Sequence, residues 1–278
     1  IDMCDSPMSV PKEKKDYSLG VALRLLSEGK GDAMVSGGNT GAVLVGSTMY
    51  VKRIRGIRRA ALAPILPTDK GGALLIDCGA NVECTPEYLL QFAYMGSFYC
   101  QKQMKIASPR IGLINNGAEE SKGTPMIKET YGLLKQAGEA GRLNFVGNIE
   151  GRDVPFGMAD VILCDGFTGN VLLKTYEGVG LYFVGELKKI FFKNLGTKLA
   201  ALLVKKGLGA LKKKMDYKEV GGAPLLGICK PVIKAHGSSD PRAFKSAIRQ
   251  AVQYAESGIV QDITENIEHM TVSAPGKN

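Results

Sequence analysis

Residues 32–42 read Asp-Ala-Met-Val-Ser-Gly-Gly-Asn-Thr-Gly-Ala, an apolar stretch that runs directly into a glycine-rich polar turn. This order predicts a short strand at 33–35, a tight turn, and a helix that begins near Gly41. At such a junction several main-chain N–H groups point at one spot, beside the positive end of the helix dipole. An anion such as phosphate can bind there without a dedicated charged side chain.

A second turn of the same kind, Asp165-Gly-Phe-Thr-Gly-Asn-Val171, follows the apolar run Val161–Cys164. Neither turn has the sequence of a P-loop or of a dinucleotide-binding fingerprint. The alternative for each is a strand-to-helix connection that uses glycine only for its backbone freedom. Two such turns at strand ends favour one active-site cleft, since ligands of parallel sheets bind there. The phosphate-binding residues are then expected to be Ser36, Gly38, Asn39, Thr40 and Gly41.

The remaining chain alternates short apolar runs with helical patterns, which predicts an α/β fold with three layers, α/β/α, around a mainly parallel sheet. With 278 residues, of which 45% are hydrophobic, the chain is long enough for one large domain or two smaller lobes, and we expect a single domain over residues 1–278. Strands are expected at Ala33–Val35, Ala61–Ile65, Ala73–Ile76, Arg110–Ile114, Asn144–Val146, Val161–Leu163 and Val232–Ala235. Helices are expected near Ser18–Glu28, Gly41–Lys52, Pro86–Lys102, Pro125–Gln136, Asn170–Leu181 and Pro241–Glu256.

A lysine-rich segment interrupts this alternation. Residues 187–215 contain nine lysines but neither arginine nor an acidic residue, and those nine charges equal the net charge of +9 of the whole chain. Leucine or phenylalanine recurs every four positions from Leu187 to Leu203, which indicates basic amphipathic helices. We therefore expect a helical arm inserted at residues 183–216, with breaks near Gly196 and near residues 207–209.

Three interpretations of this arm compete. It is a helix pair that packs on the core with a solvated lysine face, a surface that binds anionic membranes, or a nucleic-acid site. Nucleic acid is disfavoured, because no arginine or aromatic platform accompanies the lysines. We expect packing near the base and membrane contact at the tip, and an acidic protein partner would be attracted to the same charge. The membrane-contacting residues are expected to be Leu199, Leu202, Leu203 and Val204.

Polar residues at the strand ends are the candidates for chemistry. His236 ends an apolar run and enters a Gly-Ser-Ser turn before the helix at Pro241, whereas a lone histidine is more often structural. On the second turn, Asn170 and Lys174 would face a bound anion or an acyl carbonyl, and Asp165 would orient one of the catalytic groups. The catalytic residues are therefore expected to be Asp165, Asn170, Lys174 and His236.

Other polar side chains are expected to line the same cleft. Asp77 and Asn81 follow the strand that ends at Ile76 and would either orient other loops or meet substrate. Thr168 lies on the second turn, where its alternative role is to cap the helix. Lys122, in a loop after the strand at Arg110, would contact an anion or remain solvated.

The six cysteines form no CxxC pair and no metal-site spacing, which favours reduced structural thiols in a cytoplasmic protein. Neither a metal nor a cofactor is expected. The sequence shows no signal peptide, and its apolar runs are too short to span a membrane.

Five motifs together resemble one family, the bacterial phosphate acyltransferases of phospholipid synthesis (PlsX). They match its order and spacing over nearly all 278 residues, the lysine-rich arm included. The family is related in fold to phosphotransacetylases and to the isocitrate/isopropylmalate dehydrogenases. The motifs are Ser36-Gly-Gly-Asn-Thr-Gly-Ala42, Asp77-Cys-Gly-Ala-Asn81, Gly147-Asn-Ile-Glu-Gly-Arg-Asp153, Asp165-Gly-Phe-Thr-Gly-Asn-Val171 and His236-Gly-Ser-Ser239.

The resemblance implies that acyl-ACP and inorganic phosphate are converted to acyl phosphate and ACP. It also implies a homodimer bound peripherally to the inner face of the cytoplasmic membrane, which passes its product to a downstream glycerol-3-phosphate acyltransferase. Two departures stand out. The family has roughly eighty further N-terminal residues, a length in keeping with domain sizes, and the loop Gly117-Ala-Glu-Glu-Ser-Lys-Gly123 differs in its glutamates but keeps Lys122.

Phosphate is already anionic at neutral pH, and a thiolate is a good leaving group. We therefore expect direct attack of phosphate on the thioester in a ternary complex, by positioning and charge stabilisation. An acyl-enzyme on Cys164 is the weaker alternative, because nothing in its surroundings indicates a lowered pKa. Two other functions stay open: a CoA-dependent enzyme similar to phosphotransacetylase, and a non-catalytic membrane scaffold.

Overall fold

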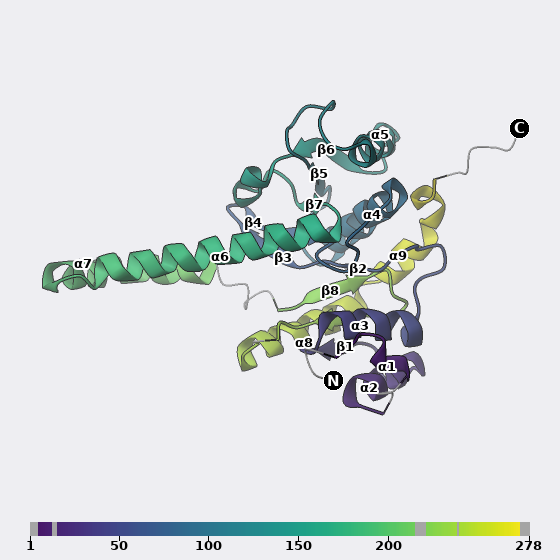
Figure 1. Ribbon diagram of the computed structural model, residues 1–278, viewed down its shortest axis with the longest axis horizontal. Helices are drawn as coiled ribbons and strands as arrows, with labels where there is room; N and C mark the ends of the chain where they lie inside the picture. Colours follow the sequence, from purple (N-terminus) through teal and green to yellow (C-terminus); the bar gives the residue numbers. More distant parts are fainter. Residues whose placement is uncertain (1–4, 13–15, 215–220, 238, 273–278) are drawn as a thin grey trace, which may run out of the picture.

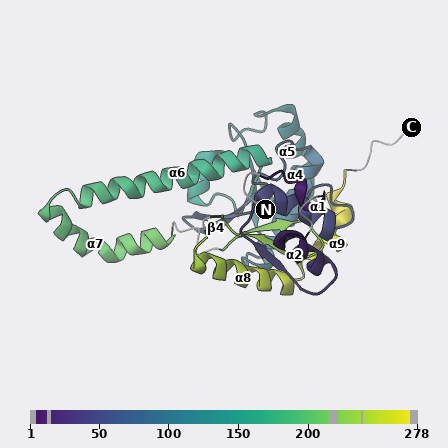
Figure 2. The ribbon, with the colours of Figure 1, turned by 60° about the horizontal axis from the view of Figure 1, so that its bottom comes forward.

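The computed structural model describes residues 5–12, 16–214, 221–237 and 239–272. These residues form a body of two β-sheets covered by helices. Two long helices, α6 (Gly166–Phe191) and α7 (Leu195–Lys214), project together from one side of this body (Figure 1, Figure 2).

The body contains short strands that alternate with helices, as the sequence predicted. In chain order, the elements before α6 are α1 (Ser9–Lys12), α2 (Ser18–Ser27), β1 (Met34–Ser36), α3 (Thr40–Gly46), the π-helical turn η1 (Ser47–Val51), β2 (Ala61–Leu62), β3 (Ile65–Thr68), β4 (Gly71–Ile76), α4 (Pro86–Lys102), β5 (Arg110–Ile114), α5 (Pro125–Glu139), β6 (Asn144–Ile149), the 3-10 helix η2 (Gly151–Phe156) and β7 (Val161–Leu163). After α7 follow β8 (Ala223–Leu226), β9 (Val232–Lys234), α8 (Pro241–Glu256), α9 (Ile259–Glu265) and the 3-10 helix η4 (Ile267–Met270).

The larger sheet has the strand order β3-β4-β7-β5-β6, and only the β3–β4 pair is antiparallel. Successive side chains of a strand point to opposite faces. Leu74 and Val161 therefore pack on the side of α4 and α5, whereas Leu75 and Ile162 pack on the side of η2 and the first turns of α6. This arrangement gives the expected three layers, α/β/α.

The smaller sheet has the order β1-β9-β8-β2, in which only β1 and β9 run parallel. Val232 of β9 packs with α2 and α3, and its neighbour Ile233 faces the core beneath α4 and α8. This sheet is therefore also covered on both faces. The larger sheet is the mainly parallel sheet that was expected, and the smaller sheet adds one parallel and two antiparallel strand pairs.

Several predicted elements have the observed bounds, among them β5, β7, α4 and α8. The predicted strand Ala61–Ile65 is wrong, because the chain crosses from one sheet to the other inside it. Ala63 donates its N–H to Pro224 O of β8, whereas Pro64 O accepts from Leu75 N of β4. The strand β8 was not predicted, since it is short and contains Pro224.

The arm differs from its expected form. The helix α6 starts at the second glycine turn and continues unbroken past residue 183, and the expected end of the arm at residues 215–216 lies outside the described residues. The expected break near Gly196 lies slightly earlier, at residues 192–194, where Asn194 caps α7 by accepting from Thr197 N at 2.9 Å. The expected break at residues 207–209 is wrong, because a helix-interior glycine costs only about 1 kcal/mol and need not end the helix.

The arm exposes most of its apolar side chains to solvent. Among the described residues of α6, only Gly166 and Gly169 are buried. Leu203 of α7 is 88% exposed, and Leu199 and Leu202 are more than half exposed. The interpretation of the arm as a core-facing helix pair is therefore wrong along most of its length. None of the helices that the structure describes has the length and apolar content needed to cross a bilayer.

Candidate active site

Asp77 connects the two sheets at the carboxyl end of β4. Its buried carboxylate accepts hydrogen bonds from the main-chain N–H groups of Leu62 (2.8 Å), Cys78 (2.7 Å), Ala80 (3.1 Å) and Asn81 (2.6 Å). Burial raises the pKa of Asp77 to about 6, although hydrogen bonds from Leu62, Asn81 and Cys78 lower it. The group is therefore a carboxylate at neutral pH, and it holds the strand ends together rather than facing solvent.

Two of the predicted turns meet at this point. Asn81 O accepts a hydrogen bond from Gly166 N at 2.7 Å, and Asn81 Nδ2 donates to Ala60 O at 2.8 Å. A Cβ placed on Gly79 would lie 3.8 Å from the Asn170 side chain. The turn 77–81 and the turn 165–170 are thus packed against each other, as expected for one cleft.

Asp165 and Thr168 form the cap at the start of α6. Asp165 Oδ1 accepts from Thr168 N at 2.8 Å, and Asp165 Oδ2 accepts from the Thr168 hydroxyl at 2.9 Å. This geometry is that of an N-cap, which satisfies one of the free N–H groups of the helix. The alternative that Thr168 caps the helix is wrong, because Asp165 is the N-cap and Thr168 donates to it.

Asn170 and Lys174 lie four residues apart on α6, and both are exposed. Lys174 Nζ forms an ion pair with Glu177 at 2.8 Å. Burial raises the pKa of Cys78 and lowers the pKa of Lys234; the nearby charge of Lys174 opposes the first shift and adds to the second. Lys174 therefore lies near the ends of both β4 and β9, at the junction of the two sheets.

The first glycine turn lies at the carboxyl end of β1. Asn39 caps α3 by accepting from Ala42 N at 3.0 Å, and its Nδ2 donates to Asp5 O at 3.4 Å. Among the described residues, no acceptor is bonded to the main-chain N–H groups of Thr40 and Gly41. Pro7 packs over the turn, because its Cγ lies 2.6 Å from where a Cβ on Gly41 would be.

His236 follows β9 and is exposed. Its main-chain oxygen accepts from Ser239 N at 3.0 Å and lies 3.9 Å from the place of a Cβ on Gly37. The turn after β9 and the first glycine turn are therefore neighbours, as expected from two parallel strands that end together.

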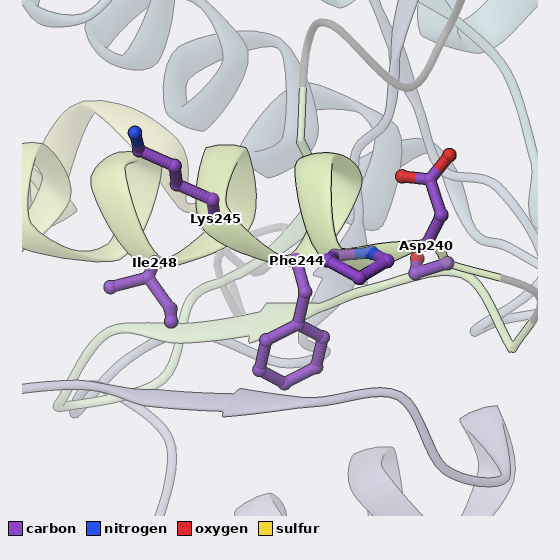
Figure 3. Close-up of a pocket in the computed structure, with 6 residues that line it drawn as sticks. Asp240, Phe244, Lys245 and Ile248 are labelled. Atoms are coloured by element: carbon purple, nitrogen blue, oxygen red, sulfur yellow. The ribbon is translucent and has the colours of Figure 1, made fainter.

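A shallow depression of about 500 Å³ adjoins this turn on the side of α8 (Figure 3). Phe244 connects the depression to the first turn, since its Cε2 lies 4.0 Å from the place of a Cβ on Gly37. None of the predicted catalytic residues lines it. The lining residues are Ser239, Asp240, Pro241, Phe244, Lys245 and Ile248.

Lys122 lies in the loop after β5, at the same edge of the larger sheet as Asp165, and its side chain is exposed. Its main-chain oxygen accepts from Asn115 Nδ2 at 3.2 Å, which closes the loop on itself. Asn148 Nδ2 donates to Glu119 O at 2.9 Å. The loop is thus fixed to β6, and contact between the exposed Lys122 side chain and an anion stays a prediction.

Sequence reasoning missed Lys234, the last residue of β9. This lysine is only 9% exposed, and its Nζ donates to Ala235 O at 2.7 Å. The signal was present in the sequence, because a lysine stands inside the otherwise apolar run Val232–Ala235. Burial, followed by the nearby charge of Lys174, lowers the pKa of Lys234.

The described cysteines are free, as expected, and Cys78 and Cys164 are buried at the ends of β4 and β7. Burial raises the pKa of Cys78 to about 12 and that of Cys164 well above its usual value. Both therefore remain protonated thiols at neutral pH, which disfavours an acyl-enzyme on Cys164. Within the described part of the chain, no three His, Cys, Asp or Glu side chains are placed to hold a metal ion.

Two solved structures share the fold. A phosphotransacetylase from Streptococcus pyogenes superposes with a TM-score of 0.57 at 20% identity, over 84% of this chain and 65% of that one. A branched-chain phosphotransacylase from Enterococcus faecalis V583 superposes with a TM-score of 0.53 at 17% identity, over 86% of this chain and 79% of that one. At these identities the likeness defines a class of α/β/α proteins and nothing finer.

Sequence comparison defines the family. The model of the family described as "Fatty acid synthesis protein" matches residues 1–262. A phosphate acyltransferase of Alkaliphilus oremlandii is 48% identical over 266 residues, which are 96% of this chain and 78% of the relative. A phosphate acyltransferase of Thermoanaerobacterium thermosaccharolyticum is 50% identical over 264 residues, which are 95% of this chain and 78% of the relative. The chain therefore belongs to the fatty acid synthesis protein family and is an acyltransferase, which confirms the family expected from the five motifs.

Proposed function

We propose that this acyltransferase moves an acyl group from the thioester of an acyl carrier protein to inorganic phosphate, for phospholipid synthesis. The observation that carries the proposal is the first glycine turn at the end of β1. Its N–H groups at Thr40 and Gly41 donate to no described acceptor, and the turn after β9 lies beside it. Such a turn binds a tetrahedral anion through its backbone.

In this proposal phosphate is bound by residues of the first turn, and the donor carbonyl lies towards α6. Asn170, Lys174 and His236 stabilise the negative charge that develops on the thioester oxygen, in the manner of an oxyanion hole. Asp165, together with Thr168, positions Asn170 through the cap of α6. Asp77 and Asn81 hold the two sheets in register beneath the cleft, and Lys122 meets the donor at its rim. The phosphate-binding residues are Ser36, Gly38, Asn39, Thr40 and Gly41.

Phosphate then attacks the carbonyl carbon directly. One C–O bond forms, the C–S bond breaks, and the carrier thiol leaves as a thiolate that takes up a proton from water. The buried, protonated state of Cys164 supports this direct route over an acyl-enzyme. No cofactor is needed for any of these steps.

The function is tested by incubating the protein with palmitoyl-ACP and phosphate and following the release of free carrier thiol. Parallel reactions use palmitoyl-CoA and acetyl-CoA. We expect release from palmitoyl-ACP that depends on phosphate. Turnover of acetyl-CoA alone would instead indicate the phosphotransacetylase function, and release that is independent of phosphate would indicate a thioesterase.

The arm is proposed to attach the protein peripherally to the cytoplasmic membrane. Leu199, Leu202, Leu203 and Val204 are 59%, 65%, 88% and 44% exposed, and lysines flank them in the sequence. Apolar side chains enter the headgroup region, and each lysine gains about 1 kcal/mol from anionic lipid. Product formed there passes to a downstream glycerol-3-phosphate acyltransferase without crossing water.

Changing Leu202 and Leu203 together to serine is expected to lower binding to phosphatidylglycerol vesicles at least tenfold. Each leucine contributes roughly 2 kcal/mol when it is buried in an apolar phase. Co-sedimentation measures the binding, and turnover of soluble palmitoyl-ACP should stay within twofold of wild type. Leu25→Ser is the matched control, since Leu25 is an exposed leucine of α2 in the body. Equal vesicle binding by the double variant and the control would contradict the membrane proposal.

A homodimer is proposed for the base of the arm. Leu181, Tyr182 and Phe183 of α6 are 73%, 64% and 59% exposed and follow one another directly. The rings of Tyr182 and Phe183 lie 6.0 Å apart, centroid to centroid, and exposed aromatic side chains that gather in this way mark an interaction site. A second copy of the chain would cover it, while the tip remains available for lipid.

A further inference from the structure

Lys234 carries a positive charge in a buried place. The residue is 9% exposed, and the one described hydrogen bond of its ammonium group goes to the main-chain oxygen of Ala235, at 2.7 Å. Within the described residues, no carboxylate forms an ion pair with it. An ammonium that has lost its hydration without gaining a counter-ion is costly. The fold would be stabilised if an anion bound beside this group.

The register of the smaller sheet places Lys234 beside the first glycine turn. Ser36 of β1 is paired with Lys234 of β9 in a parallel ladder, and Ala235 N donates to Ser36 O at 2.9 Å. Alternation along the two strands puts both side chains on the face that Met34 and Val232 share. The Ser36 hydroxyl, which accepts from Gly38 N at 3.3 Å, therefore lies next to the Lys234 side chain.

A second cation lies across the junction of the sheets. Lys174 of α6 is close enough for its charge to oppose that of Lys234, and it is itself paired with Glu177 at 2.8 Å. Two ammonium groups that approach each other repel unless an anion lies between them.

We propose that Lys234 is the residue that neutralises the acceptor phosphate, together with the Ser36 hydroxyl. This role rests on the proposed function, in which phosphate is the acceptor, and it makes Lys234 the positively charged group of the phosphate site. The ammonium keeps its proton and donates to one phosphate oxygen. A second oxygen of the same phosphate remains free to attack the thioester carbon, and the C–S bond breaks as the C–O bond forms.

The test compares Lys234→Met with wild type in steady-state kinetics. Methionine fills a similar volume without charge, so the variant should fold. We expect the KM for phosphate to rise at least tenfold, while the KM for palmitoyl-ACP stays within twofold. Phosphate should also raise the melting temperature of wild type and leave that of the variant unchanged, a readout that does not depend on turnover. Lys230→Met is the matched control, since Lys230 precedes the other end of β9.

An unchanged KM for phosphate in a folded Lys234→Met protein would overturn the inference and leave the proposed function intact. Absence of phosphate-dependent turnover in wild type would instead overturn the function. Lys234→Gln, which retains a donor for Ala235 O, is the second variant. If neither substitution yields a folded protein, Lys234 is an element of the fold and the inference is wrong.

Discussion

Gly169→Ala is expected to destabilise the protein by about 3 kcal/mol or more, the range of severe overpacking. An added Cβ would overlap the main-chain oxygen of Asp77 and lie 3.0 Å from Cys164 Sγ. Both obstacles are buried, and one is backbone, so neither can move aside without shifting the junction between the sheets. For a domain of this size the melting temperature should fall by roughly 10 °C. Activity should fall as well, because Asn170 and the turn 77–81 are displaced together.

Gly178→Ala is the matched control, because it is the same substitution at a later position of the same helix, α6. A Cβ at Gly178 meets nothing within 4 Å. Alanine is the better helix former by about 1 kcal/mol, so this variant should be as stable as wild type or more so. Thermal unfolding followed by circular dichroism measures both. Equal melting temperatures for the two variants would show that α6 is not held against Asp77 as described.

His236→Ala is expected to lower kcat for palmitoyl-ACP by about 100- to 1,000-fold, the effect of removing one oxyanion donor. The imidazole is exposed, so the melting temperature and the binding to vesicles should remain those of wild type. His269→Ala is the control. The chain has only these two histidines, and His269 lies in η4, where its Nε2 is 3.6 Å from Glu268 Oε1.

The pair of histidine variants also separates an enzyme from a scaffold. A non-catalytic membrane scaffold would keep its function in both variants, whereas the acyltransferase loses turnover only in His236→Ala. Comparable kcat values for the two variants would remove His236 from the catalytic group. The donor carbonyl would then depend on Asn170 and Lys174 alone.

Much of the candidate site was predictable from the sequence. Each of its polar turns directly follows an apolar run, and each contains glycine, which gives the backbone the freedom that a tight turn needs. The meeting of turn 77–81 with turn 165–170 follows from β4 and β7 being parallel neighbours. The cap formed by Asp165 was also visible as an Asp-x-x-Thr pattern. The cap and the glycine turns are determined by residues close in sequence, whereas the meeting of the two turns also needs the pairing of β4 with β7.

The rest depended on contacts between distant segments. The burial of Lys234 arises because β9 lies between β1 and β8, and a strand's place in a sheet cannot be deduced from its own residues. The crossing of the chain between sheets at Ala63 and Pro64 has the same origin. In the arm, periodicity predicted the amphipathic helices correctly. It did not predict that their apolar faces remain exposed, since burial requires a partner surface.

The most direct test of the central claim is to quantify the acyl product itself. Palmitoyl-ACP and phosphate are incubated with the protein, hydroxylamine traps any acyl phosphate as its hydroxamate, and free carrier thiol is measured in the same samples. We predict one hydroxamate for each thiol released, with both signals absent when phosphate is omitted. Thiol release accompanied by free palmitate and no hydroxamate would contradict the account, because the acyl group would then have gone to water instead of phosphate.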